Sequence, residues 1–572
     1  MYIGLQKSLP NYSTSILKTV IRKCASITPN DTENVIYPPI LDLSRCARLK
    51  RKYENWHNKI QKIETVEEKL IGINMPHYYG WKSLRLEEGK VPYNSLEHAQ
   101  YITRTHVTND NKLPDFYDSM ITTQKLDALV QTIKNHIENV IIFEYNHRFV
   151  KEKLLKDVVA NALVFQINRI MLSALSSITP HLLETEVDFK PRVEAFWFAG
   201  GIERSTRSRK ARESIERLKE YANDPINMPV QYVGSPILQL RHQFPLREIT
   251  SPIYSTNPEL SIPEFKFDPR VLRYTFSHQR ATNIPGFWPG DPAEFGLLSY
   301  HNINNLFFNS KLEDEEAITV QAIFASYSWL LSQACYQGFS TVNDITYPLV
   351  SQTILTNGQY WSFCVYQLNT ILLHWEYADS NPLRNICWIT EPMMLFDKIE
   401  DGKVQGFNED VLKKLITFYI NMPAARSNEN MKPYLGESVK YVANIADPER
   451  RAWLESTFKY LMSNRPRHKL LPEIYNWQKI YMIDHATRST DKRRDPWEFG
   501  FSAAKRRLNQ HQPAYIPRCL RENPKKRKIG RWAKTYYPDI GEGSLLPKWL
   551  VGDLVHGNNQ LFRLAIFAFP NR

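Results

Sequence analysis

The most constraining feature of the sequence is a long apolar helix pattern followed closely by a strand–turn–strand pattern. Apolar side chains recur with helical spacing from Glu316 to Gln337, and Gly338 stands where a helix end often needs a residue without a side chain. Asn357 and Gly358 then separate two apolar runs, and this residue pair tolerates the positive φ angles of a hairpin turn. These patterns predict a buried helix beside an antiparallel hairpin. The two hairpin strands are expected at Val350–Leu355 and Tyr360–Leu373.

Periodic apolar residues predict further elements throughout the first 423 residues. Helices are expected at Leu49–Leu70, Thr123–Glu144, Asn146–Ser176 and, after a capping Asn408, up to Ile420. Strands are expected at Arg192–Phe198, ended by Gly200 and Gly201, and at Ile386–Ile389, whereas Tyr232–Lys266 should form irregular strands and loops without a helix. These elements lack a regular βαβ alternation and a repeat of about 20 to 50 residues, so the predicted fold class is α+β, with mixed helices and antiparallel strands.

Positive charge is concentrated in the C-terminal part of the chain. The 572 residues include 73 Lys and Arg and 60 Asp and Glu, but residues 424–572 contain 28 of the basic residues and only 14 of the acidic ones. The body up to residue 423 is therefore nearly neutral. We expect three parts: a transit-like segment at 1–30, an α+β core at 31–423, and an extended basic C-terminal extension at 424–572.

The first 30 residues are typical of a mitochondrial transit segment. They contain Lys7, Lys18, Arg22 and Lys23, several Ser and Thr, and no acidic residue before Asp31. A mildly basic N-terminus can also arise by chance, and this alternative stays open.

Cysteine usage and hydropathy exclude several other classes of protein. The six cysteines form no CxxC pair, so neither a disulfide framework nor a zinc site is expected, which favours a reducing compartment. Polar residues interrupt the longest apolar stretches, at 158–175 and 322–339, so no membrane span is expected.

A first group of basic residues follows Gly200 and Gly201. It is expected on a loop, where its cations could contact the phosphates of a nucleic acid. As an alternative, Glu213, Glu216 and Glu220 could balance these cations in a solvated turn. The candidate RNA-binding residues of this group are Arg204, Arg207, Arg209, Lys210 and Arg212.

A second group of basic residues lies in the C-terminal extension. Between residues 488 and 534 there are 15 basic and four acidic residues, interleaved with aromatic side chains that can stack on unpaired bases. Several prolines favour an extended segment. The run at 525–528 could instead be a nuclear-localisation signal, which the transit-like N-terminus disfavours. The candidate RNA-binding residues here are Lys505, Arg506, Arg507, Lys525, Lys526, Arg527, Lys528, Arg531 and Lys534.

The sequence contains no recognised catalytic or metal-binding motif. It has no GxSxG, HExxH or HxE…PCxxC pattern, and the two glycines at 200 and 201 lack the spacing of a nucleotide-binding loop. A nucleophilic Cys335 or Cys364 assisted by His374 is the alternative, but a lone cysteine on an apolar face is usually a buried hydrophobic residue. We therefore expect no catalytic residue, no metal and no cofactor.

Five short runs in the second half of the core resemble one known family. They are Tyr336–Phe339, Pro348–Gln352, Tyr366–Thr370, Asn385–Trp388 and Gly406–Leu412. The family is that of the mitochondrial ribosomal protein originally catalogued as small-subunit protein thirty, also named programmed cell death protein nine, and later assigned to the large subunit. The resemblance covers about residues 37–423 and does not include the basic extension.

The resemblance implies a non-catalytic, structural constituent of the mitochondrial large ribosomal subunit, which supports mitochondrial translation in the matrix. The partners it implies are mitochondrial ribosomal RNA, the paralogous large-subunit protein thirty-seven and other ribosomal proteins. A free mitochondrial RNA-processing or RNA-modifying enzyme is the alternative, because such an enzyme could use the same basic extension to capture its substrate. The role of the extension in RNA binding rests on its charge alone.

Overall fold

The computed structural model describes most residues between 45 and 436. The described residues are 45–66, 69, 82–108, 110–147, 153–278, 282–287, 290–306, 315–340, 343–374, 377–436 and 446–448. The chain divides into two units, residues 1–56 and 57–572.

Helix α2 (Arg45–Gln61) ends well before the predicted Leu70. The amides of Lys62 and Ile63 bond to carbonyl oxygens three residues earlier, and this tightening of the last turn ends the helix.

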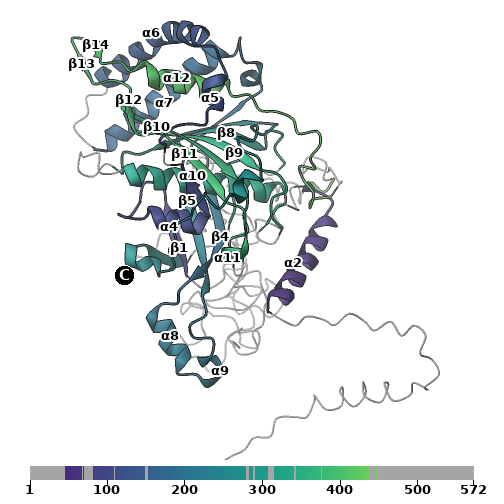
Figure 1. The fold of residues 1–572 in the computed structure, drawn as a ribbon. Helices are drawn as coiled ribbons and strands as arrows, with labels where there is room; N and C mark the ends of the chain where they lie inside the picture. Colours follow the sequence, from purple (N-terminus) through teal and green to yellow (C-terminus); the bar gives the residue numbers. More distant parts are fainter. Residues whose placement is uncertain are drawn as a thin grey trace, which may run out of the picture. The chain divides into compact units, whose positions relative to one another are not determined.

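A large mixed sheet lies at the centre of the second unit (Figure 1). Its strands follow the order β2-β11-β10-β9-β8-β6-β3, and β12 pairs with β10 outside this path. Their bounds are β2 Thr105–Val107, β3 Glu186–Phe189, β6 Leu238–His242, β8 Phe295–Asn302, β9 Leu349–Thr356, β10 Tyr360–Leu368, β11 Asn385–Ile389 and β12 Met393–Met394. The β9–β10 hairpin and β11 confirm the predicted strands, although β10 ends at Leu368 and not at the predicted Leu373. Two pairs, β8 with β9 and β11 with β2, are parallel.

The turn of the β9–β10 hairpin differs from the expected one. Gly358 has a φ of +96°, whereas Asn357 does not adopt a positive φ. Instead, the Asn357 side-chain oxygen accepts hydrogen bonds from the amides of Gln359 and Tyr360, at 3.0 and 2.7 Å. Thr356 Oγ1 accepts another from the Gly358 amide at 2.9 Å. These side-chain bonds hold a longer turn in which only the glycine needs the left-handed region.

Helix α10 (Glu315–Tyr336) confirms the predicted buried helix. It connects the parallel strands β8 and β9, so the fold contains a βαβ crossover. Every residue from Val320 to Tyr336 is buried. The helix is followed by Gly338, whose φ of +93° is the left-handed conformation expected after a helix end.

A four-stranded sheet covers the other side of α10. Its order is β4-β5-β1-β7. The bounds are β1 Lys82–Glu87, β4 Val193–Ile202, β5 Ile226–Gly234 and β7 Thr275–His278. One hydrophobic core includes Leu84 of β1, Trp197 of β4, Tyr327 of α10 and Tyr366 of β10. Helix α4 (Leu96–Thr103) packs beside α10. The α10 helix therefore joins the two sheets through one core.

The two glycines at 200 and 201 do not end the strand, contrary to the prediction. β4 continues to Ile202, and its pairing with β5 is irregular between Ala199 and Ile202. Gly201 has a φ of +75°, and a Cβ at this position would lie 2.2 Å from the hydroxyl oxygen of Tyr101. Glycine thus permits a bulge that packs against a tyrosine from α4.

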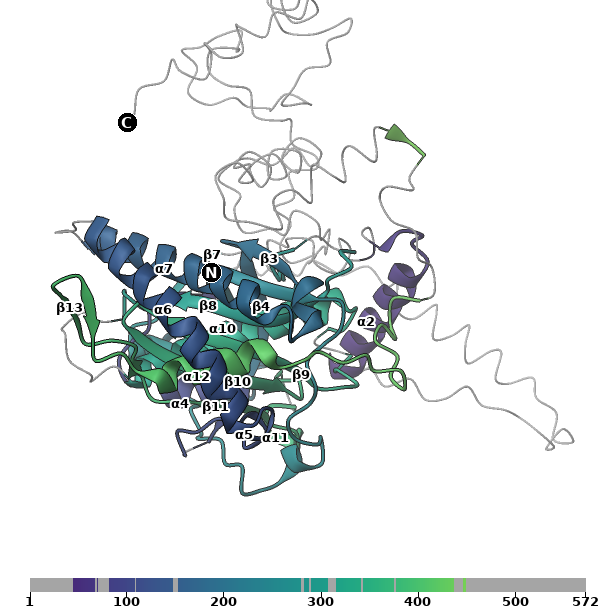
Figure 2. The ribbon, with the colours of Figure 1, turned by 90° about the horizontal axis from the view of Figure 1, so that it is seen from above.

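Three helices cover the opposite face of the large sheet, as the view from above in Figure 2 shows. They are α6 (Thr123–His147), α7 (Lys153–Leu175) and α12 (Glu409–Ile420). All three overlap their predicted ranges, although Asn146, the expected first residue of α7, belongs to α6. The predicted cap of α12 is confirmed, since the Asn408 side chain accepts a hydrogen bond from the Asp410 amide at 2.9 Å.

Helix α7 contains an apolar stretch, Asp157–Leu175, that is long enough to cross a membrane. Its residues Leu163, Ile167 and Met171 are buried in the core that α7 shares with α6 and α12. A long helix with one face buried in this way is typical of a packed helical layer.

The segment Tyr232–Lys266 is more regular than predicted. Strand β6 is an interior strand with every residue buried, so its pattern shows no polar alternation. A short 3-10 helix, η2 (Tyr254–Thr256), occurs where no helix was expected. The remaining short elements are α5 Phe116–Ser119, η1 Pro180–Leu183, η3 Pro269–Leu272, α11 Tyr377–Ser380, β13 Lys398–Glu400 and β14 Lys403–Gln405.

Gly296 on β8 allows α10 to approach the large sheet closely. A Cβ at this position would lie 2.3 Å from the Trp329 ring and 2.8 Å from Gln333 Nε2. We expect Gly296→Ala to lower the free energy of unfolding by about 1–3 kcal/mol, because the helix must shift to relieve the overlap. Urea unfolding measures the difference. An unchanged stability of Gly296→Ala would contradict this packing.

Candidate functional site

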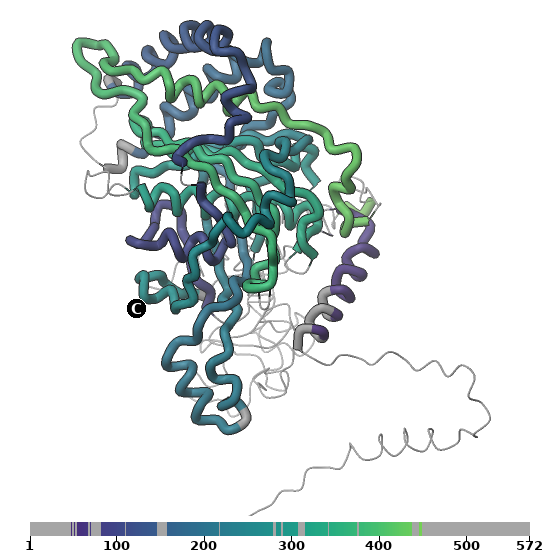
Figure 3. The backbone as a smooth tube through the Cα atoms, viewed as in Figure 1, coloured from purple at the N-terminus to yellow at the C-terminus, as the bar shows by residue number. Residues whose placement is uncertain are grey.

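A helical arm joins β4 to β5 at one end of the small sheet. It contains α8 (Thr206–Glu213) and α9 (Glu216–Lys219). Figure 3 shows the chain leaving β4, folding into these two helices and returning as β5. Ser205 caps α8, since its side chain accepts a hydrogen bond from the Ser208 amide at 3.4 Å. None of the α8 residues is buried.

The first group of predicted RNA-binding residues lies on this arm. Most of them belong to α8 and not to the expected loop, because Ser205 provides a cap and the following Arg, Lys and Ala residues are good helix formers. The structure exposes Arg207, Arg209 and Lys210 and partly buries Arg204 and Arg212. Arg209 pairs with Glu213 at 3.7 Å. Arg207 and Lys210, one turn apart, form no ion pair with any described residue, so both cations are accessible to a partner.

The second group of predicted RNA-binding residues lies outside the described residues. It consists of Lys505, Arg506, Arg507, Lys525, Lys526, Arg527, Lys528, Arg531 and Lys534. Their contact with RNA stays a prediction from charge.

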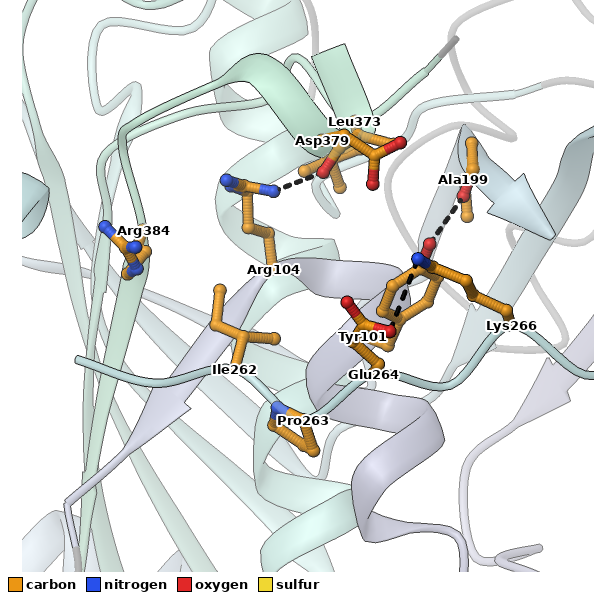
Figure 4. Close-up of a pocket in the computed structure, with 12 residues that line it drawn as sticks. Tyr101, Arg104, Ala199, Ile262, Pro263, Glu264, Lys266, Leu373, Asp379 and Arg384 are labelled. Carbon is orange, nitrogen blue, oxygen red and sulfur yellow. Dashed lines mark hydrogen bonds and ion pairs between the residues drawn. The ribbon is translucent and has the colours of Figure 1, made fainter. Parts of the chain in front are cut away.

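A polar pocket of about 190 Å³ lies where the arm begins (Figure 4). Helix α4 contributes Tyr101 and its C-terminal cap Arg104, and β4 contributes Ala199 and Gly200. The segment 262–266 and residues in and around α11 complete the wall. The charged side chains of the wall are Arg104, Glu264, Lys266, Asp379 and Arg384. The sequence did not indicate this pocket, because four separate segments form it.

Arg104 holds the wall of the pocket together. Its guanidinium group donates hydrogen bonds to three carbonyl oxygens around α11, those of Ala378 at 2.5 Å, Leu383 at 2.8 Å and Asn381. The residue has a φ of 50° at the end of α4, which turns its side chain toward α11. Arg104 therefore fixes a positive charge beside the pocket while it serves a structural role.

Tyr101 lines the pocket as a neutral phenol. Its hydroxyl donates a hydrogen bond to the Gly200 carbonyl oxygen at 3.4 Å. Burial, together with the negative charges of Asp379 and Glu264, raises the pKa of Tyr101 to about 12. Because the proton stays on the oxygen at neutral pH, Tyr101 can present its ring to a ligand but cannot act as a base.

The other charged side chains of the pocket differ in how many hydrogen bonds and ion pairs they form. Lys266 Nζ lies 3.3 Å from a carboxylate oxygen of Glu264. One terminal nitrogen of Arg384 donates to the carbonyl oxygens of Thr256 and Pro382, at 3.3 and 2.8 Å. Asp379 is exposed and forms no hydrogen bond or ion pair with any described residue. The pocket thus presents one carboxylate that is available as a hydrogen-bond acceptor.

A buried array of Glu88, His301 and Ser299 has the hydrogen-bond order of a hydrolase triad. Glu88 Oε1 lies 2.7 Å from His301 Nδ1, and His301 Nε2 lies 3.1 Å from Ser299 Oγ. Ser299 is buried, and its hydroxyl is also 3.2 Å from Thr353 Oγ1, so a substrate carbonyl has no room to reach it. The array connects strands of the fold. No local motif could have revealed it, because Glu88 is distant in sequence from the other two residues.

The cysteines considered as nucleophiles lie in unsuitable surroundings. Burial raises the pKa of the Cys335 thiol to about 12, whereas a reactive cysteine needs a lowered pKa. Cys364 Sγ lies inside the large sheet, 3.5 Å from Cys387 Sγ. Among the described residues, no group of three or more His, Cys, Asp or Glu side chains is arranged to bind a metal ion.

His98, one turn before Tyr101 on α4, links stability to pH. Its ring is buried between the rings of Phe265 and Tyr274, at centroid distances of 5.0 Å each, and neither nitrogen has a hydrogen-bond partner among the described residues. Burial lowers the pKa of His98 from 6.5 to about 3. Below pH 6.5 the unfolded chain therefore binds a proton at His98 that the folded chain does not bind. The free energy of unfolding is unaffected by His98 above pH 6.5, and it decreases as the pH falls from 6.5 toward 3.

We expect His98→Phe to reduce the acid sensitivity of the fold. This histidine should cost the wild-type chain about 1 kcal/mol of unfolding free energy for each pH unit below its unfolded pKa, and phenylalanine has no such titration. Urea unfolding of the wild type and of His98→Phe at about pH 7 and about pH 5 gives, for each protein, the slope of the unfolding free energy against pH. The exposed His136→Gln variant should behave like the wild type. Equal slopes for the wild type and His98→Phe would contradict the expectation.

A sequence model of a known protein family matches this chain. The family is described as Mitochondrial 28S ribosomal protein S30 (PDCD9), and the match covers residues 6–423. The matched range includes both sheets, the helical layer, the arm and the pocket, and it ends before the basic extension. The resemblance inferred from the five short runs is thereby confirmed.

Proposed function

Since the chain belongs to the mitochondrial 28S ribosomal protein S30 (PDCD9) family, we propose that it is a structural constituent of the large subunit of the mitochondrial ribosome, located in the matrix. The family is one of mitochondrial ribosomal proteins, and the match over residues 6–423 is the observation that carries the proposal. The chain docks on mitochondrial ribosomal RNA, on the paralogous large-subunit protein thirty-seven and on other ribosomal proteins. In this way it supports mitochondrial translation.

The distribution of charge supports a docking role on RNA. The body up to residue 423 is nearly neutral, so its contact with RNA must depend on local groups of cations. Arg207 and Lys210 on the arm, which are exposed and form no ion pair within the described part of the chain, make up one such group. The basic residues at 505–507 and 525–534 form another, through an extended segment. A few separate phosphate contacts suit a protein that assembles with RNA and other proteins.

The polar clusters of the described core support a structural role. Arg104 ties α4 to the segment around α11, and the Glu88–His301 pair joins the end of β1 to β8. Arg241 is buried and forms ion pairs with three carboxylates, those of Glu186, Asp188 and Asp291. These groups are engaged with one another, and removal of one partner would leave the other without a counterpart inside the fold.

Sedimentation of mitochondrial lysate tests the proposal. We expect the chain to travel with large subunits, together with a marker protein of that particle. The matched family is named after the 28S particle, so migration with small subunits would overturn the subunit assignment alone. Recovery only in light fractions would overturn the ribosomal role. Turnover of mitochondrial transcripts by the purified chain would favour the RNA-processing or RNA-modifying alternative.

Neutralising the arm tests its contact with phosphates. The double variant Arg207→Gln with Lys210→Gln should bind mitochondrial ribosomal RNA more weakly. Its slope of log K against log salt should be shallower by about 1.4, since each phosphate contact on a single strand contributes about 0.7. Filter binding over a range of salt concentrations measures this slope.

The matched control for this prediction removes two cations elsewhere. Arg85 and Lys90 are both paired with Glu87, so Arg85→Gln with Lys90→Gln should leave the salt slope unchanged. An equal change in both double variants, or in neither, would refute a specific contact of the arm with RNA.

A further inference from the structure

The pocket lies at the base of the arm, close to the start of α8. Strand β4 forms part of the pocket wall at Ala199 and Gly200 and leads directly into the capped start of α8. The Glu203 amide donates a hydrogen bond to the Lys266 carbonyl oxygen at 2.7 Å, which fixes the segment 262–266 to the same strand end. The arm and the pocket are therefore parts of one continuous surface.

The size of the pocket suits a single six-membered ring. A protein cavity of about 150 Å³ is known to hold benzene, and this pocket has a volume of about 190 Å³. It therefore has room for one ring with a few substituents, such as a pyrimidine base. Figure 4 shows Tyr101, Arg104 and Lys266 around this space, and the Tyr101 ring offers a face for stacking.

The hydrogen-bonding groups of the wall distinguish between the two pyrimidines. Asp379 is the exposed carboxylate that accepts no hydrogen bond from any described residue. Cytosine carries an amino group at N4, which donates to a carboxylate, whereas uracil carries a carbonyl oxygen at that position, which a carboxylate repels. Lys266 and Arg384 supply donors for the acceptor atoms of a nucleotide.

The net charge of the wall favours a nucleotide over a basic side chain of a partner protein. The wall contains three cations, Arg104, Lys266 and Arg384, and two carboxylates, Glu264 and Asp379. A lysine or arginine guest would add a further positive charge to this surplus. A phosphodiester at the mouth of the pocket would instead be attracted by it.

We propose that this pocket binds an unpaired cytidine of RNA, with the Asp379 carboxylate accepting a hydrogen bond from cytosine N4. The contact adds base specificity to the phosphate contacts of the arm. This inference rests on the proposed function, because it takes RNA as the partner of this surface.

Titration calorimetry of the full chain with CMP and with UMP tests the inference. The wild type should bind CMP about tenfold more tightly than UMP, which is the discrimination that one good base contact provides. In Asp379→Asn the side-chain amide can donate to uracil O4, so the preference should disappear or reverse. Asp379 is exposed, so this substitution leaves the core untouched. The control Glu220→Gln removes one exposed carboxylate from the arm and should keep the wild-type preference.

Equal affinities of the wild type for CMP and UMP, or an unchanged preference in Asp379→Asn, would overturn the inference. Tighter binding of N-acetyl-arginine methylamide than of CMP would assign the pocket to a partner protein instead. Sedimentation of the Asp379→Asn chain distinguishes a failure of the cytidine site from a failure of the proposed ribosomal role. A chain that still travels with ribosomal subunits but shows no cytidine preference leaves the proposed function standing, whereas a wild-type chain found only in light fractions overturns the function itself.

Discussion

The burial of α10 between two sheets is the interaction on which the rest of the structure depends. A helix covered on both sides must satisfy its polar side chains internally. Gln321 accepts a hydrogen bond from the Gly89 amide at 2.9 Å, and Gln333 accepts one from the Gly296 amide at 2.9 Å. The helix is therefore bonded to the loop after β1 and to the edge of a bulge in β8. By fixing the small sheet in this way, α10 also fixes β4, from which the arm and the pocket wall extend.

Local sequence patterns were sufficient to predict the long helices and strands. They were insufficient where contacts between distant segments determine the course of the backbone. The α10 helix and the Asn408 cap follow from residues within a few positions of each other. The turn between β13 and β14 carries an equally local signal that was missed, since Asp401 and Gly402 both have positive φ angles. By contrast, the course of β4 through Gly201 depends on Tyr101, which comes from another segment. No reading of the two glycines alone could have foreseen the bulge.

The candidate site also has a part that local sequence patterns predict and a part that they do not. The cations of the arm form a compact group in the sequence, and recognising Ser205 as a cap would also have placed them on a helix. The pocket could not have been foreseen, because Tyr101, Lys266 and Asp379 come from three segments that meet only after both sheets have packed on α10. Its specificity would depend on Asp379, whose carboxylate has no sequence context that marks it as different from other exposed acids.

The burial of each cation separates those that stabilise the fold from those available to a partner. Arg241 is buried, and its ion pairs with Asp188 and Asp291 raise its pKa although burial alone would lower it. A partner could reach such a group only by breaking these contacts, which would leave the partly buried Asp188 and Asp291 without their cation. Arg207 and Lys210 have no such partners among the described residues, and an exposed cation that meets a phosphate releases counterions without disturbing the core. The proposed contact of the arm with RNA would therefore leave the stability of the core unchanged.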